Sequence, residues 1–257
     1  MTFCLGMRME GGLVGIADTR ITTGSECITA RKLTHYSGEN GAFFVMSSGL
    51  RSVRDKTLTY FEEVYGNQEE PWGRLFQICN EMAHQLRRVA EEDRHYLEQG
   101  GLSFNTHVLI GGQMEHDKEH MLYLLYPQGT WVEIGVGTPY SIIGNSGYGK
   151  PVLDRALHYS DSLRYAFKVG CLSFDSTRIS AADVDLPVDV ILMPRDARRL
   201  TYRRFHKADF SDITNYWDER LRRAIKNLPF ERLESLFQEE PEEFMELLEA
   251  GEIGSSP

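Results

Sequence analysis

The chain has 257 residues, of which 41% are hydrophobic and 26% are charged, a balance typical of a globular protein with a sizeable core. No run approaches the roughly 20 apolar residues that a membrane-spanning helix needs, so the composition argues against a membrane protein. The net charge of −10 disfavours nucleic-acid binding as a main role, because such binding depends on basic surfaces.

The four cysteines lie far apart in the sequence and form no CxxC pair. This spacing argues against a disulfide framework and against a zinc knuckle. The first residues also lack a basic stretch followed by a long apolar run, the pattern of a signal peptide. We therefore expect reduced thiols and a cytoplasmic protein.

The first 48 residues are expected to form strands. Short strands are expected over residues 2–9, 13–17, 28–33 and 42–46. The turn Glu10-Gly11-Gly12 predicts that the first two strands form a hairpin. The second run is apolar throughout, which indicates a strand buried on both faces.

The middle of the chain predicts two pairs of helices, each followed by strands. Apolar residues recur every three or four positions over residues 50–66 and 72–99, as on one face of a helix. The later elements are expected as strands at 107–111, 120–126, 130–134 and 140–143, helices at about 149–158 and 162–173, and strands at 186–193 and 200–205. Blocks of strands separated by helix pairs favour an α+β fold with antiparallel sheets.

Residues 209–257 are expected to form a helical extension to a domain that spans residues 1–208. Asp212 is expected to cap a helix, and short helices are expected to begin at Pro229 and Pro241. Residues 231–250 contain eight glutamates and one arginine. We interpret them as a solvated acidic tail, with a docking element for a neighbouring subunit as the alternative.

Two motifs have simpler explanations than a ligand site. The segment from Gly144 to Lys150 matches GxxxxGK, but Pro151 stands where a phosphate-binding loop has Ser or Thr. We interpret it as a turn from a strand to a helix. The histidines and acids at residues 115–120 would suit a metal, but their place between two strands favours a solvated loop.

Thr2 begins the most informative constellation. Removal of Met1 would leave a threonine with a nucleophilic hydroxyl and an α-amine that acts as base. Such an amine has a pKa of about 7.7–8.0, close to what a general base needs at neutral pH. Asp18 is expected at the end of the second strand, Lys32 on the third, and Gly49 where the fourth strand meets a helix. A free backbone N–H at that last position suits an oxyanion.

These residues resemble the proteasome β-type family of N-terminal nucleophile hydrolases. The closest similarity is to its bacterial Anbu branch, whose members begin Met-Thr-Tyr-Cys-Leu-Gly where this chain has Met-Thr-Phe-Cys-Leu-Gly. The resemblance covers residues 2–205. It implies a four-layer α-β-β-α sandwich with a C-terminal helical extension, no metal or organic cofactor, and ring-like assembly of identical chains.

The resemblance also implies a role for each matching residue. Thr2 would be the nucleophile, Lys32 the positive charge beside it, and Asp18 the partner of Lys32. Gly49 would donate its N–H to the oxyanion, and Ser146 would relay a proton at the α-amine. The alternatives are that Asp18 caps a turn, that Lys32 is a surface lysine, and that Ser48 and Gly49 only begin a helix.

The second accessory motif of the family is matched only in part. Ser180 corresponds to the serine of Asp-x-x-Ser-Gly, but Thr177 and Ala181 stand in place of the aspartate and the glycine. Asp175 is the nearest acidic residue. Whether Asp175 or Thr177 takes the aspartate's role stays open.

The implied function is threonine-type hydrolysis of peptides or unfolded polypeptides inside a homo-oligomer. Two alternatives remain: an amidase for a small amide, and a catalytically weak assembly scaffold. The sequence points to no particular cleavage preference, ring size or ATPase partner.

Overall fold

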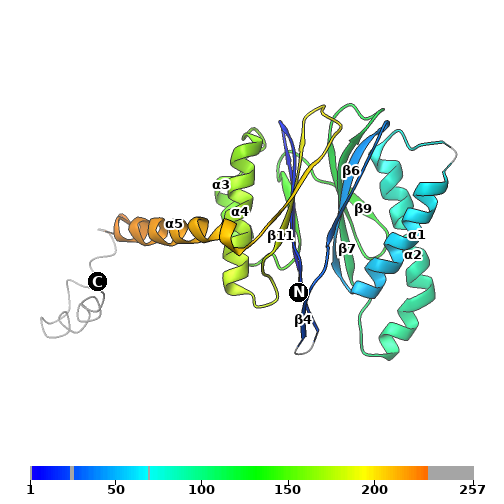
Figure 1. Ribbon diagram of the computed structural model, residues 1–257, viewed down its shortest axis with the longest axis horizontal. Coiled ribbons are helices and arrows are strands. Elements are labelled where there is room, and N and C mark those ends of the chain that lie inside the picture. The colour runs from blue at the N-terminus through cyan, green and yellow to red at the C-terminus, as the bar shows by residue number, and fades with distance from the viewer. Residues whose placement is uncertain (1, 24–25, 69, 231–257) are drawn as a thin grey trace, which may run out of the picture. The chain divides into compact units, whose positions relative to one another are not determined.

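The computed structural model describes residues 2–23, 26–68 and 70–230 (Figure 1). The chain forms two compact units, Met1–Thr214 and Asn215–Pro257. The first unit contains both large sheets and all the site residues named above. Of the second unit, residues 215–230 are described, and they are helical as far as Lys226.

One five-stranded sheet carries the N-terminal strand at its interior. Its strand order is β10-β1-β2-β11-β12, with antiparallel pairing throughout. The strands are β1 (Phe3–Met9), β2 (Gly12–Asp18), β10 (Tyr140–Gly144), β11 (Val188–Pro194) and β12 (Thr201–Phe205). Every residue of β1 and β2 is buried, as the continuous apolar run of the second strand predicted.

A second antiparallel sheet has the order β5-β6-β7-β8-β9. Its strands are β5 (Leu33–Gly38), β6 (Gly41–Gly49), β7 (Thr106–Met114), β8 (Met121–Leu125) and β9 (Trp131–Glu133). Buried side chains from both sheets, among them Cys4, Leu33 and Phe44, form one core cluster. The two sheets therefore pack face to face.

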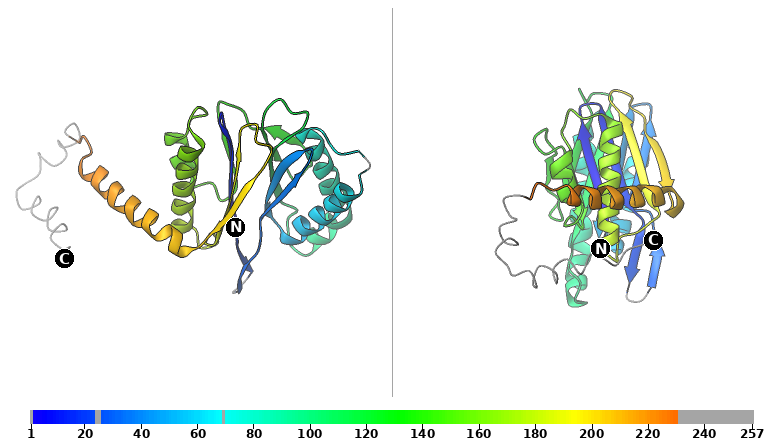
Figure 2. Two further views of the ribbon diagram at one scale, coloured as in Figure 1. Left: turned by 45° about the horizontal axis from the view of Figure 1, so that its top comes forward. Right: turned by 90° about the vertical axis from the view of Figure 1, so that its left-hand side faces the viewer.

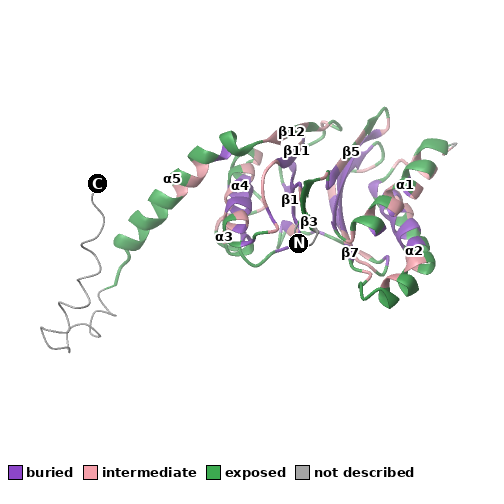
Figure 3. Cartoon of the chain, turned by 60° about the horizontal axis from the view of Figure 1, so that its bottom comes forward, coloured by how far each residue is buried: buried purple, intermediate pink, exposed green. Residues whose placement is uncertain are grey.

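A helix pair covers the outer face of each sheet (Figures 1 and 2). Helices α1 (Arg51–Asn67) and α2 (Leu75–Gln99) share a core with β6, β7 and β8. Helices α3 (Lys150–Ala156) and α4 (Leu163–Ser180) share another with β1, β2 and β11. Buried residues follow the strands and the helix faces that meet them (Figure 3). The predicted α+β fold with four α-β-β-α layers is confirmed.

The structure corrects the predicted third strand. Residues 28–33 are not one strand: an exposed hairpin of β3 (Arg20–Thr23) and β4 (Glu26–Thr29) comes first, and β5 starts at Leu33. Lys32 therefore lies in the link between β4 and β5 and not on a strand. The Ala30 N–H donates to Thr19 O at 2.8 Å, which extends the β3–β4 pairing by one residue, so the hairpin includes the first part of the predicted strand.

Two helix boundaries were also wrong. Helix α4 continues to Ser180 rather than ending near residue 173, and α5 (Lys207–Lys226) begins before Asp212. Asp209 accepts a hydrogen bond from the N–H of His206 at 2.7 Å, and it lies in the first turn of α5. Residues 228–230 are not helical, and the helix expected at Pro241 and the acidic segment 231–250 lie outside the described residues.

No helix in the described ranges is long and apolar enough to cross a bilayer. The same ranges contain no group of three or more His, Cys, Asp or Glu residues arranged to hold a metal ion. The loop at residues 115–120 is not solvated throughout, since His120 is almost fully buried. Its Nε2 lies 2.7 Å from Met9 O, so the neutral ring donates a hydrogen bond there.

We expect His120 to make the stability of the fold depend on pH. Burial lowers the pKa of this imidazole, Arg8 and Arg195 lower it further, and Glu119 and the bond to Met9 O oppose them. The unfolded chain therefore binds more protons than the native chain below the ordinary histidine pKa, and stability falls as the pH falls through about 6.5.

The free energy of unfolding, measured in guanidinium at pH 5.5 and 7.5, is expected to drop on acidification. His120→Gln should reduce this drop without abolishing it, because burial also lowers the pKa of His35 and His107. An equal drop in the variant and the wild type would contradict the assignment to His120.

Candidate active site

The Asp18 carboxylate lies at the C-terminal end of β2 and has no exposed surface. Its Oδ1 accepts a hydrogen bond from the Phe3 backbone N–H at 2.8 Å, and its Oδ2 accepts one from the Arg20 N–H at 3.1 Å. The Lys32 ammonium Nζ lies 2.8 and 2.9 Å from the two oxygens. All of these contacts are donated to the carboxyl group, which fits its ionised form.

The Asp18–Lys32 ion pair is buried on both sides, with side-chain exposures of 0% and 2%. Burial raises the pKa of the Asp18 carboxyl, while the Lys32 ammonium and the N–H groups of Phe3 and Arg20 pull it down. A charge in such a place needs all its partners, since an unpaired buried ion is strongly destabilising. The Asp18 carboxylate, paired with Lys32, thus holds the Phe3 N–H at the start of β1.

Thr2 is held at the start of β1 by backbone contacts on both sides. Its carbonyl oxygen accepts a hydrogen bond from Asn145 N–H at 2.6 Å, and the next residue, Phe3, is bonded to Asp18. Gly144 pairs with Phe3 and has a φ of +92°. A Cβ at Gly144 would lie 1.9 Å from Thr2 O, so only glycine permits this approach.

The end of β6 reaches the same place. The Ser47 N–H donates to Lys32 O at 3.1 Å, and the Cys4 thiol lies 3.7 Å from Ser47 O. Gly49 ends β6 with a φ of +108°, and a Cβ there would lie 1.7 Å from Asn105 O. The structure therefore brings Thr2, Asp18, Lys32 and the strand that ends at Gly49 together.

The predicted relay residues are less closely connected. Ser146 is exposed and follows Asn145 in the turn beneath Thr2, so it is adjacent to the site through the backbone. Ser180 is exposed at the end of α4, and within the described ranges no hydrogen bond joins its side chain to Thr2, Asp18 or Lys32.

The two candidates for the missing aspartate make other contacts. Asp175 Oδ1 accepts hydrogen bonds from Arg178 at 2.6 and 3.0 Å and from Thr214 at 2.8 Å. Thr177 donates its hydroxyl to Ser173 O in its own helix at 2.9 Å. Neither side chain bonds Thr2, Asp18 or Lys32 in the described part of the chain.

Sequence reasoning missed Asn145 and the backbone N–H of Phe3. Both contribute a backbone N–H, and a pattern of side chains in the sequence does not predict such a contact. Asn145 stood inside the turn that we had interpreted as a link from strand to helix, and the glycine before it was the available signal.

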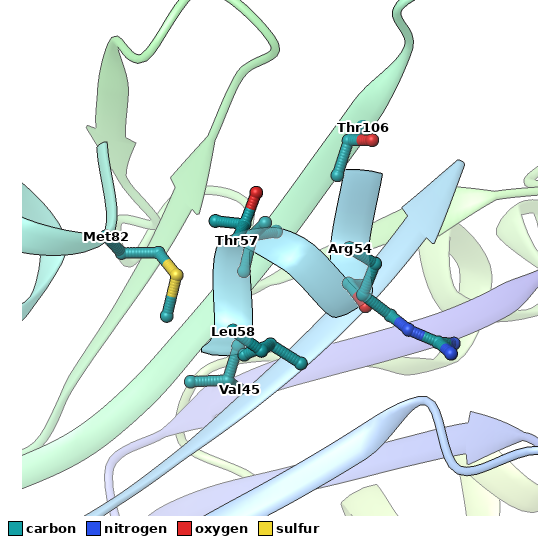
Figure 4. A pocket seen from close by; sticks show the side chains of 8 residues that line it. Val45, Arg54, Thr57, Leu58, Met82 and Thr106 are labelled. Carbon is teal, nitrogen blue, oxygen red and sulfur yellow. The ribbon is translucent and has the colours of Figure 1, made fainter. Parts of the chain in front are cut away.

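A small pocket opens between the helix pair α1–α2 and strands β6 and β7 (Figure 4). It has a volume of about 10 Å³, room for roughly one water molecule. Ser47 and Thr106 are among its lining residues, and their buried hydroxyls have no hydrogen-bond partner in the described residues. The pocket is too small for a substrate, so the candidate site is defined by Asp18 and Thr2 instead.

Solved structures of Anbu match this chain over most of its length. Anbu from Yersinia bercovieri, described as an ancestral β-subunit, is 29% identical with a TM-score of 0.81, covering 88% of this chain and 97% of the Anbu chain. A helical assembly of the Anbu complex from Pseudomonas aeruginosa gives 26% identity, a TM-score of 0.83 and coverages of 88% and 97%. The chain is Anbu-like.

A third Anbu structure, a Gly-1 mutant from Hyphomicrobium sp. strain MC1, gives 27% identity, a TM-score of 0.81 and coverages of 89% and 98%. The similarity thus spans nearly the whole of each Anbu chain, and the fold is that of a proteasome β-like N-terminal nucleophile hydrolase. No family model matches the sequence, and a search of curated proteins found no match.

Proposed function

We propose that this chain is a threonine-type N-terminal nucleophile hydrolase that cleaves peptide bonds as part of a homo-oligomer. The single observation that carries the proposal is the Asp18 carboxylate, which bridges the Lys32 ammonium and the Phe3 N–H directly after Thr2. A buried ion pair is costly to fold, and this one lies where a nucleophile at Thr2 would need it.

In the proposed reaction, removal of Met1 frees the α-amine of Thr2. The amine accepts the proton of the Thr2 hydroxyl as its oxygen attacks the substrate carbonyl, and the Gly49 N–H donates to the developing oxyanion. The positive charge of Lys32 favours the ionised hydroxyl. The amine then returns the proton to the leaving nitrogen, and water releases the acyl group from Thr2.

Assembly from identical subunits is the second part of the proposal. It is supported by the likeness to Anbu from Pseudomonas aeruginosa, which was solved as a helical assembly. Enclosure by neighbouring subunits would restrict substrates to short peptides and unfolded segments. Ser146 and Ser180 are proposed as relay residues at the amine, with Ser146 the better placed of the two through its neighbour Asn145.

The test is the intact mass of the purified protein after incubation with a peptide epoxyketone. This reagent forms a ring with the hydroxyl and the free amine of a terminal threonine, so we expect loss of Met1 and addition of one inhibitor. The same peptide ending in a carboxamide is the matched control and should leave the mass unchanged. Retained Met1 with no adduct would contradict the hydrolase and favour the assembly scaffold.

A panel of peptide and small-amide substrates separates the two enzymatic readings. Peptide turnover by protein that also forms the adduct is expected here. An adduct without peptide turnover, together with hydrolysis of a small amide, would favour the amidase.

A further inference from the structure

Thr19 and Arg20 form the corner between β2 and β3, directly after Asp18. This corner is poorly supported by the sheets themselves. Arg20 begins β3, and β3 pairs only with β4 among the described residues. A two-stranded hairpin is marginally stable by itself, and β4 is exposed along its whole length. Yet the Arg20 N–H is one of the donors that hold the Asp18 carboxylate.

A segment far away in the sequence supports this corner. We name it the 185–187 segment, and it leads into β11. The Arg20 guanidinium Nη1 lies 2.8 Å from Asp185 Oδ2, and the Thr19 hydroxyl donates to Pro187 O at 2.6 Å. The carboxylate of Asp185 is itself oriented by the N–H of Leu186 at 2.8 Å.

The two contacts differ in their surroundings. Thr19 is fully buried, whereas the side chains of Arg20 and Asp185 are 32% and 42% exposed. An ion pair with that exposure contributes little to global stability. Its effect is local, because it restrains the residue whose N–H binds Asp18.

We propose that Asp185 is a positioning residue for the site at Thr2. By holding the Arg20 side chain, Asp185 keeps the Arg20 N–H on Asp18, and Asp18 in turn holds Phe3 and Lys32. The anchoring of the corner stands on these contacts alone, and the effect on the reaction rests on the proposed function.

The experiment compares Asp185→Asn and Arg20→Gln with the wild type. Asp185→Glu is the conservative variant. Glu92→Gln is the control for the loss of a half-exposed carboxylate elsewhere, because Glu92 on α2 pairs with Arg88 at 3.2 Å and with Lys56 of α1 at 2.7 Å. Three quantities are measured: hydrogen exchange of peptides covering residues 3–9 and 18–22, the rate of adduct formation with the peptide epoxyketone, and Tm.

We expect Asp185→Asn and Arg20→Gln to speed exchange in both peptides by about fivefold or more and to slow adduct formation by about tenfold. The Tm should stay within about 3 °C of the wild type, because the pair is half exposed. Asp185→Glu should restore both rates in large part, and Glu92→Gln should change neither.

Unchanged exchange in Asp185→Asn would overturn the proposal. Faster exchange with an unchanged adduct rate would overturn the role in the reaction, and faster exchange over the whole chain with a large fall in Tm would show general destabilisation instead. Failure of the wild type to form any adduct would refute the proposed function, while the exchange data would still decide whether Asp185 anchors the corner.

Discussion

Asp18→Ala is expected to destabilise the protein by about 3–5 kcal/mol, the usual cost of leaving a buried charge without its partner. The change removes both oxygens that Lys32 contacts, and it also leaves the N–H groups of Phe3 and Arg20 without their acceptor. Equilibrium unfolding in urea, at one fixed protein concentration, gives the free energy.

Two further variants make this result specific. Asp18→Ala combined with Lys32→Met should cost less than the sum of the single changes, because the double variant leaves no buried ion. Asp55→Ala removes an exposed carboxylate that pairs with Arg51 and Arg54 on α1, and it is expected to cost no more than about 1 kcal/mol. A loss of under about 1 kcal/mol for Asp18→Ala would contradict the importance of the buried pair.

Thr2→Ala is expected to lower peptide hydrolysis by about 10³-fold or more, the scale found when a catalytic nucleophile is removed. Alanine still permits removal of Met1, so the variant keeps the α-amine and lacks only the nucleophile. Thr2→Ser keeps both groups and should retain measurable activity. Initial rates on a fluorogenic peptide, with intact masses to verify loss of Met1, make the comparison.

The control for Thr2→Ala is its stability. The carbonyl of residue 2 still accepts the bond from Asn145, and Phe3 still donates to Asp18, so Tm is expected to shift by only a few degrees, in the order of 1 kcal/mol. Full hydrolysis by this variant would show that the activity comes from another residue or from a contaminant.

The layers of the fold could be predicted from the sequence because the apolar patterns of its elements are local. The all-apolar run of β2 and the stripe of Cys79, Met82 and Leu86 on α2 both describe burial that the structure shows. The prediction of the third strand was wrong because its residues are divided between two elements. Its residues belong partly to an exposed hairpin, where Ile28 is 43% exposed, and local hydropathy does not show that Ile28 and Thr29 pair with β3.

The candidate site, too, could be predicted only in part. Asp18 and Gly49 lie at the strand ends that the sequence predicted. Lys32 contacts Asp18, although it lies in a link between two strands and not on the predicted strand. Arg20 pairs with Asp185 beside the site. The partner itself could not be predicted, because 165 residues separate the two and no local pattern links them.

The atom that fastens the start of β1 has a consequence for maturation. Asp18 binds the amide nitrogen of Phe3 rather than that of Thr2, and Asn145 binds the Thr2 carbonyl. Neither contact involves the nitrogen that removal of Met1 would release. The precursor and the processed chain would therefore share one backbone scaffold, and cleavage would convert an inert amide into a basic amine without a folding step. Under the proposed function, removal of Met1 alone would complete the site, because the backbone around Thr2 would already have its final conformation in the precursor.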